Sequence, residues 1–578
     1  MKPETPAQRE PYRRGGNRQR RRMLSTLLGL ASAVALAAGL SACGGGGTTA
    51  SAKPAANTKP SPAAAGTKPA QGGTIYYAHD LEVPCLQGGW VEENYIERQY
   101  ADSLVSQVSS GHLVPWLATS WSISKNQETY TFHLKPDVKF SDGTPLNAQA
   151  VVDNFYFWTN PKSGNSDVNA YIGPYFKSAK ALNNLTVEVN LKAPYSPLLS
   201  SLSQSYDGIL SPKGLARGID ANCVDPIGSG PFIIQKWNHG QNIVFVRNPN
   251  YNSWPANALH KGPPHVSKLV WSFVSEPTTR WASLTTGQSD VIEDVPTVDF
   301  PQAKSQYNLA EYVTPGRPQT LSLNTDLGPF TDVLVRQAFA YAINRRAAVQ
   351  SAFNGAIPYD GNGALSPSTP DYDTALNNSF PYNPAKAAAL LNQAGWTTRD
   401  AAGYRTKDGK ELNITLVYGL GSIVNDEGAT LLEDLQQEWK AVGFNVKLLP
   451  ATLTQLFGGQ FDTPKGYDAT IGYWTSPTPA VLYITYLPWN APGDPNYSNS
   501  TFYDSAQLVK TIADANSSLN PATQDADYTK AQELIVNQAV AVGLYTKTTT
   551  LAWSKNLHDV WIEDSQGDPV FADAYITK

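Results

Sequence analysis

Residues 113–155 read LVPWLATSWSISKNQETYTFHLKPDVKFSDGTPLNAQAVVDNF, and this stretch decides the fold class. Its residues 129–134 alternate between apolar and polar side chains, which predicts a strand with one buried face. The turn residues 141–145 follow, and Asn147 then caps a helix whose apolar residues recur at helical spacing as far as Trp158. The stretch therefore predicts strands packed against a helix.

The second half of the chain predicts further helices next to strands. Asn383 is an N-cap followed by proline, and Gly395 marks the end of that helix. A second apolar stripe stops at Gly443, and the strand 444–449 follows directly. Because strand and helix patterns alternate along the chain, we expect an α/β or α+β architecture with more than one lobe.

The first 42 residues are typical of an export signal. A basic run ends at Arg22, an apolar stretch fills 23–40, and small residues precede Cys43. A membrane anchor is the alternative, but the stretch is rich in Ala, Gly and Ser and a small-residue cleavage site follows at once. We therefore expect 1–42 to be a signal peptide.

Residues 40–43, Leu-Ser-Ala-Cys, resemble the lipobox of bacterial lipoproteins. The resemblance implies that Cys43 is the first mature residue and carries a lipid that holds the protein at the outer face of the cell membrane. The arginines at 20–22 also resemble a twin-arginine signal, so the export route stays open. Residues 43–71 contain no large apolar side chain and are expected to form a flexible linker.

Composition and motifs argue against several classes of function. The net charge is −5, and much of the basic charge lies in the expected signal peptide, so a nucleic-acid-binding face is not expected. Seven dispersed His and the absence of phosphate-binding, zinc-binding or nucleophile motifs predict no enzyme, no metal and no cofactor. In the exported body, Cys85 and Cys223 form either one disulfide, which we favour, or two separate buried thiols.

Four ordered motifs resemble the solute-binding lipoproteins of ABC importers, in particular the peptide/nickel-type class, solute-binding protein family 5. The motifs occupy residues 113–155, 226–251, 323–345 and 382–387, and the likeness runs from about Gly72 to the C-terminus. The resemblance implies an α/β, two-lobed periplasmic-binding-protein-like fold of type II. This large class has an extra subdomain in the first lobe and a ligand cleft between the lobes.

The resemblance also implies domain boundaries. The first lobe is expected to comprise 72–322 plus 544–578, with the subdomain near 112–193, and the second lobe 323–543. Both cysteines of the body then fall in the first lobe, which favours their pairing.

The implied function is capture of oligopeptides or dipeptides and their delivery to membrane permease subunits that work with a separate ATPase. Peptide binders of the family hold the peptide α-amine with an Asp that follows an aromatic motif. Here Tyr473-Trp474-Thr475-Ser476 has no carboxylate after it before Asp494. An oligosaccharide or another neutral organic solute is therefore the alternative ligand, and a secreted hydrolase is less favoured.

Aromatic side chains with hydroxyl neighbours suit a peptide backbone or a sugar. The candidate ligand-binding residues are Trp474, Tyr473 and Ser476 from the second lobe, with Trp90 and Tyr171 from the first. We expect the protein to act as a monomer.

Overall fold

The computed structural model describes residues 69–86, 94–109, 111–160, 166–421, 423–456, 458–489 and 498–577. The expected signal peptide, Cys43, most of the linker and Trp90 lie outside these residues. Among the described helices, none combines the length and the apolar character that crossing a membrane requires.

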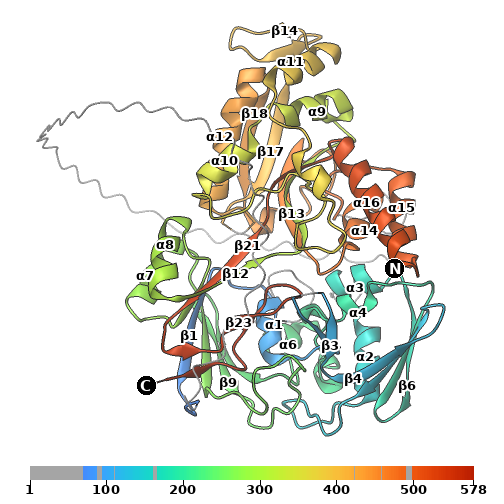
Figure 1. The fold of residues 1–578 in the computed structure, drawn as a ribbon, viewed down its shortest axis with the longest axis vertical. Helices are drawn as coiled ribbons and strands as arrows, with labels where there is room; N and C mark the ends of the chain where they lie inside the picture. Colours follow the sequence, from blue (N-terminus) through green and yellow to red (C-terminus); the bar gives the residue numbers. More distant parts are fainter. Residues whose placement is uncertain are drawn as a thin grey trace, which may run out of the picture. The chain divides into compact units, whose positions relative to one another are not determined.

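The first lobe is built on a seven-stranded sheet with the order β12-β21-β11-β1-β10-β9-β8 (Figure 1). Its strands are β1 (Thr74–His79), β8 (Phe232–Asn238), β9 (Asn242–Arg247), β10 (Lys268–Phe273), β11 (Val291–Glu293), β12 (Asn308–Val313) and β21 (Thr548–Trp553). Alternate residues of β1 enter different cores: Tyr77 packs with residues of α1 (Asn94–Tyr100), and Ala78 with residues of α7 (Pro277–Thr285) and α8 (Phe300–Gln306). The sheet therefore has helices on both faces.

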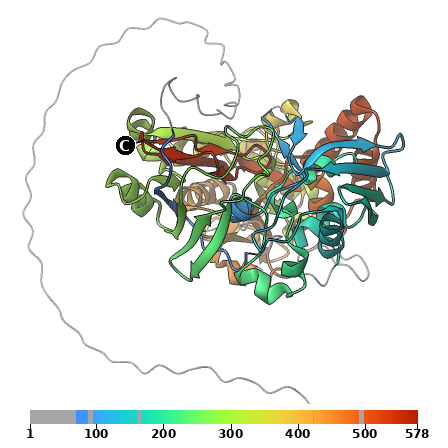
Figure 2. The ribbon, with the colours of Figure 1, turned by 90° about the horizontal axis from the view of Figure 1, so that it is seen from below.

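A separate four-stranded antiparallel sheet has the order β4-β5-β7-β6, and its strands lie within the range 112–193 expected for a subdomain. Its strands are β4 (Ala118–Ile123), β5 (Thr129–Leu134), β6 (Phe176–Asn183) and β7 (Thr186–Leu191), and α2 (Ala148–Trp158) packs on it. The strand and helix predicted from 129–134 and Asn147 are confirmed, since the Asn147 side chain accepts a hydrogen bond from the Ala150 amide. Figure 2 shows these strands, in blue and teal, grouped apart from those of the seven-stranded sheet.

The second lobe is built on a five-stranded sheet with the order β18-β17-β19-β13-β20. Its strands are β13 (Gly316–Leu323), β17 (Asn413–Gly419), β18 (Asn445–Ala451), β19 (Ala469–Thr475) and β20 (Ala541–Tyr545), and one face packs against α9 (Val333–Tyr341), α10 (Arg345–Ala352), α11 (Pro384–Gln393) and α12 (Asp426–Val442). Asn383 caps α11 as predicted. Gly443 ends α12 in the left-handed conformation, with φ 114°, which favours glycine.

A helical group of the second lobe packs beside this sheet. It consists of α14 (Val481–Tyr486), α15 (Ala506–Ser517) and α16 (Pro521–Asn537), which share one apolar cluster (Figure 1). Ala480 and Ile484 also join the apolar core of the first lobe's subdomain. The two lobes therefore share packed side chains in this structure.

The chain passes between the two large sheets at two places. β12 continues into β13 through Thr314 and Pro315, and β20 continues into β21 through Thr546 and Lys547. The Thr314 amide donates to the Lys547 carbonyl at 2.9 Å, so the two crossings lie side by side. The expected boundaries at 322/323 and 543/544 fall inside β13 and β20. Both strands belong to the second lobe because the hydrogen-bonded pairing changes sheet only at the crossings.

The remaining elements are short. They are β2 (Val105–Gln107), β3 (Leu113–Pro115), α3 (Ser166–Ile172), α4 (Leu198–Ser201), η2 (Ser205–Asp207), α5 (Pro212–Leu215), α6 (Ile219–Val224), η3 (Thr297–Asp299), η4 (Pro329–Thr331), η5 (Thr374–Asn378), β14 (Thr398–Arg399), β15 (Arg405–Lys407), β16 (Lys410–Glu411), α13 (Leu453–Leu456), β22 (Leu557–His558), β23 (Trp561–Ile562), β24 (Pro569–Val570) and β25 (Tyr575–Ile576).

Two close approaches fix the path of the chain in the first lobe. A Cβ at Gly228 or Gly230 would overlap the backbone of Tyr100, so glycine is required at both positions. Cys85 and Cys223 form a disulfide, and the Leu86 amide beside it donates to the Cys223 carbonyl at 2.8 Å. The bridge ties the segment after β1 to the end of α6.

We predict that the double substitution Cys85→Ser and Cys223→Ser destabilises the first lobe by about 2–5 kcal/mol, because the bridge closes a loop with a sequence separation of 138. Thermal unfolding monitored by circular dichroism checks this, with a thiol assay of the unfolded wild-type protein as control. An unchanged midpoint together with two reactive thiols in the wild type would contradict it.

Candidate ligand-binding site

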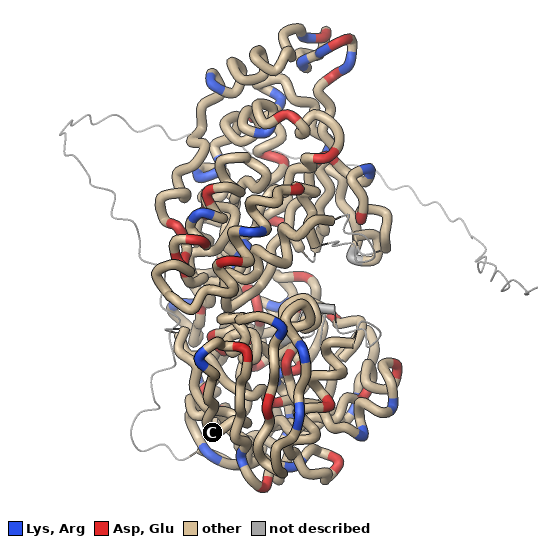
Figure 3. The backbone as a smooth tube through the Cα atoms, turned by 90° about the vertical axis from the view of Figure 1, so that its right-hand side faces the viewer, with Lys and Arg blue, Asp and Glu red and all other residues tan. Residues whose placement is uncertain are grey.

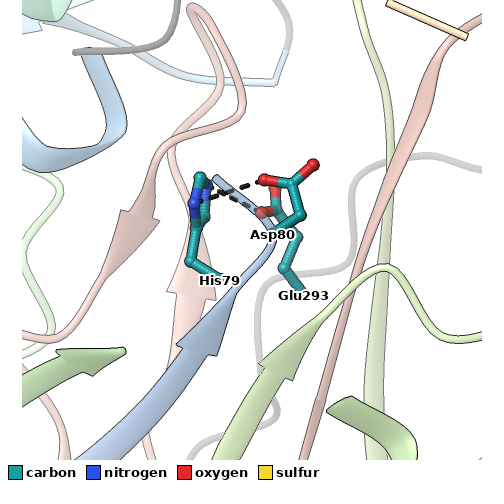
Figure 4. A group of neighbouring side chains, drawn as sticks. All are labelled: His79, Asp80 and Glu293. Atoms are coloured by element: carbon teal, nitrogen blue, oxygen red, sulfur yellow. Dashed lines mark ion pairs between the residues drawn. The ribbon is translucent and has the colours of Figure 1, made fainter. Parts of the chain in front are cut away.

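Three ionisable side chains, those of His79, Asp80 and Glu293, lie together where two parallel strands of the first lobe end. His79 is the last residue of β1 and Glu293 the last of β11, and these strands are parallel neighbours. The Nε2 of His79 is 2.8 Å from the Oε2 of Glu293, and its Nδ1 is 3.3 Å from the Oδ1 of Asp80 (Figure 4). Carboxyl ends of parallel strands are the usual place for ligands in open α/β sheets.

The electrostatics of this group favour an ion pair. Burial lowers the pKa of His79, but the charges of Glu293 and Asp80 outweigh it and raise the pKa to about 9. Burial likewise opposes ionisation of Glu293, but the charge of His79 outweighs it and lowers its pKa to about 2. His79, Asp80 and Glu293 also have the spacing of a metal site, although a metal would have to displace the proton from the imidazole.

Lys547 connects this edge of the first lobe to the second lobe. It lies in the second crossing, and its ammonium donates to the Tyr473 hydroxyl at 2.9 Å and lies 4.7 Å from the centre of that ring. The neighbouring Asp294 has its pKa raised to about 7 by burial and by the charge of Glu293, while Lys547 opposes the rise. The second crossing therefore carries the ammonium of Lys547, which acts on the carboxyl groups of Glu293 and Asp294 and contacts the ring of Tyr473.

Two of the predicted site residues meet across the lobes. Tyr171 lies on α3 of the subdomain, and Trp474 lies on β19 of the second lobe. The Nε1 of Trp474 donates to the Tyr171 hydroxyl oxygen at 3.0 Å, and that hydroxyl donates to the Thr475 carbonyl at 3.3 Å. These bonds exist only while the lobes are together, so this conformation is a closed one.

Ser476 makes its hydrogen bonds within the protein. It is buried, its hydroxyl donates to the Thr478 carbonyl at 2.9 Å, and its amide donates to the Pro315 carbonyl at 3.0 Å. These bonds hold the turn after β19 against the first crossing, so the hydroxyl is used within the protein. The predicted Trp90 and the acidic Asp494 both lie outside the described residues.

A second polar contact between the lobes involves Asn516, which sequence reasoning missed. Its Nδ2 donates to the Tyr175 hydroxyl at 3.0 Å, its carbonyl accepts from the Ser196 amide at 3.0 Å, and its Oδ1 accepts from Tyr528 at 2.6 Å. The available signal was its position: Asn516 follows Leu508 and Ile512 on the buried stripe of α15. A polar residue on a buried stripe requires hydrogen-bonding partners.

We predict that the contribution of His79 to stability depends on pH. Its pKa is raised on folding, so its stabilisation is present below the unfolded value of 6.5 and is lost as the pH rises through about 9. Substitution His79→Gln should therefore cost on the order of 1–3 kcal/mol near pH 6 and much less above pH 9. Urea unfolding at pH 6, 7.5 and 9.5 measures this difference, and the same loss at every pH would contradict the ion pair.

Residues 112–496 match the family described as "Bacterial extracellular solute-binding proteins, family 5 Middle". The nickel-binding periplasmic protein of Escherichia coli is 29% identical over 404 residues, which are 68% of this chain and 71% of that protein. A glutathione-binding protein of Shigella flexneri is 27% identical over 460 residues, 78% of this chain and 84% of its own length.

Solved structures share the fold at lower sequence identity. The oligopeptide-binding protein AppA of Bacillus subtilis, in complex with a nonapeptide, superposes with a TM-score of 0.76 at 21% identity, covering 88% of this chain and all of that one. NikA of Brucella suis, in complex with Fe(III)-EDTA, gives a TM-score of 0.74 at 24% identity, covering 87% and 100%. The two-lobed α/β fold is thereby confirmed. The chain belongs to the bacterial extracellular solute-binding proteins of family 5.

Proposed function

We propose that this protein is the extracytoplasmic solute-binding subunit of an ABC importer that captures peptides between its lobes and delivers them to a permease. A separate ATPase supplies the energy. The protein acts as a monomer, and the lipid on Cys43 holds it at the outer face of the cell membrane after export. It releases its ligand chemically unchanged.

The observation that carries the proposal is the hydrogen bond between Trp474 and Tyr171 across the lobes. A solute that contacts both lobes stabilises the conformation in which this bond forms, so binding shifts the population toward the closed state. The two adjacent crossings supply the hinge for such a movement.

Peptides are favoured over other solutes by two considerations. One sequence relative is named for glutathione, which is a peptide, and one structural neighbour holds a nonapeptide. The aromatic rings of Tyr473 and Trp474 lie where the lobes meet, and their hydrogen-bonded polar atoms keep them in fixed orientations. Fixed aromatic surfaces suit extended peptides with varied side chains.

A neutral solute such as an oligosaccharide is the second candidate. The observation that favours it is the lack of a carboxylate between Trp474 and Asp494, where peptide binders of the family are expected to have one.

We predict that the purified mature protein, stripped by unfolding and refolding, is stabilised by peptides of two to five residues. Its melting temperature should rise by a few degrees at saturating peptide, because the ligand binds only the folded state. Glutathione, maltooligosaccharides and nickel with histidine are the parallel arms, and mass spectrometry checks that the recovered peptide is intact. A rise with sugars alone, or a cleaved peptide, would contradict the proposal.

We predict that Tyr171→Phe weakens peptide binding about 3- to 10-fold, because it removes the hydroxyl that accepts from Trp474 and donates to Thr475. The loss should appear as faster dissociation, measured by stopped-flow Trp fluorescence, with unchanged stoichiometry. Tyr156→Phe, on the exposed face of α2, is the matched control and should bind like the wild type. If Tyr171→Phe and Tyr156→Phe bind peptide with equal affinity, the hydrogen bond between Tyr171 and Trp474 does not contribute to binding, and the prediction is wrong.

A further inference from the structure

One buried arginine differs from all the others that the structure describes. The buried arginines are Arg98, Arg280, Arg317, Arg336, Arg345 and Arg405. Five of them donate hydrogen bonds to backbone carbonyls or to carboxylates. Arg317 is 8% exposed, yet its Nε and Nη1 have no hydrogen-bond partner.

No described carboxylate compensates the charge of Arg317. The ionisable groups near it are the phenols of Tyr486 and Tyr467, and both phenols are neutral at physiological pH. Burial lowers the pKa of the Arg317 guanidinium. A buried charge without a partner is strongly unfavourable, whereas a protein accepts it where a ligand supplies the opposite charge. Among the residues that the structure describes, the site therefore lacks a charged acceptor.

A second donor nearby is also without a partner. The hydroxyl of Tyr486 is buried and makes no hydrogen bond, and burial raises its pKa to about 12, so it keeps its proton. Two nitrogens of Arg317 and the hydroxyl of Tyr486 thus present donor groups that have no hydrogen-bond partner. A planar carboxylate is the group that a guanidinium binds best, because it accepts two parallel hydrogen bonds.

Arg317 also lies next to the contact that joins the lobes. It is directly opposite Trp474 in the pairing of β13 with β19, so the two side chains share one face of the sheet. Gly472 lies on the same face, and a Cβ there would meet only the Nη2 of Arg317, at 3.6 Å. The missing side chain of Gly472 leaves space beside the guanidinium.

We propose that Arg317, with Tyr486, binds a carboxylate group of the transported solute beside Trp474. The proposal rests on the proposed function, in that the solute is held between the lobes, and it names the chemical class: the ligand is an organic acid or a peptide with a free carboxylate. It excludes neutral sugars as the principal ligand.

The first experiment uses acetate as the probe and does not depend on knowing the solute. The melting temperature of the stripped, full mature protein is measured in sodium acetate and in sodium chloride at equal ionic strength. We expect a rise of a few degrees in acetate for the wild type, and none for Arg317→Met. In chloride, Arg317→Met should melt no lower than the wild type, because it removes an uncompensated buried charge.

Arg336→Met is the matched control. The guanidinium of Arg336 is also buried but donates to the Gln538 and Phe330 carbonyls, so its loss should lower the melting temperature in both salts and leave the response to acetate intact. The proposal is overturned if the wild type shows no acetate-specific rise, or if Arg317→Met keeps it. Should Arg317→Met fail to fold, Arg317→Gln takes its place in the same comparison.

The second experiment separates this proposal from the proposed function. Calorimetry compares trialanine with trialanine amide. A preference of at least tenfold for the free acid, lost in Arg317→Met, supports the carboxylate site. Equal binding of acid and amide overturns it while leaving peptide capture standing. If neither peptide binds, the peptide proposal fails, and the acetate measurement still decides whether Arg317 binds a carboxylate.

Discussion

The rest of the structure depends on the pair of strands that cross between the two large sheets. Strand β12 runs into β13 and β20 into β21, and the Thr314–Lys547 hydrogen bond holds the crossings together. Two adjacent connections permit rotation about their common line and resist sliding. Each lobe can therefore keep its own core while the distance between their facing residues changes, which is the mechanical requirement of a protein that encloses a solute.

Polar groups set the specificity of the contact between the lobes. Trp474 and Tyr171 bond to one another, and Asn516 bonds to the subdomain, so these groups are satisfied without a ligand. Lys547 compensates the carboxylates at the ends of the parallel strands. Lys and Arg are interspersed with Asp and Glu along the described chain (Figure 3). Individual buried groups that lack a partner are therefore the candidates for selecting the solute.

The sequence was a good guide to the fold and a partial guide to the site. Periodicity and caps located β5, α2, α11 and α12 because those signals are local. The exact residues at which the chain changes sheet were not predictable, because they depend on strand pairing over long sequence separations. Tyr171 and Trp474 were chosen as aromatic residues and contact one another, while the Ser476 hydroxyl bonds within its own turn. Their contact with a ligand stays a prediction. Asn516 and Arg317 were missed, since burial is what makes each of them significant.

The position of Arg317 connects recognition with closure. A carboxylate at this guanidinium lies on the face of β19 that carries Trp474, and Trp474 is the residue that bonds to the opposite lobe. Without an anion, the charge of Arg317 is buried and has no opposite charge among the described residues. With an anion, the same desolvation strengthens the charge-assisted hydrogen bonds. A carboxylate bound at Arg317 would therefore be held firmly at the face of the sheet from which Trp474 reaches the opposite lobe.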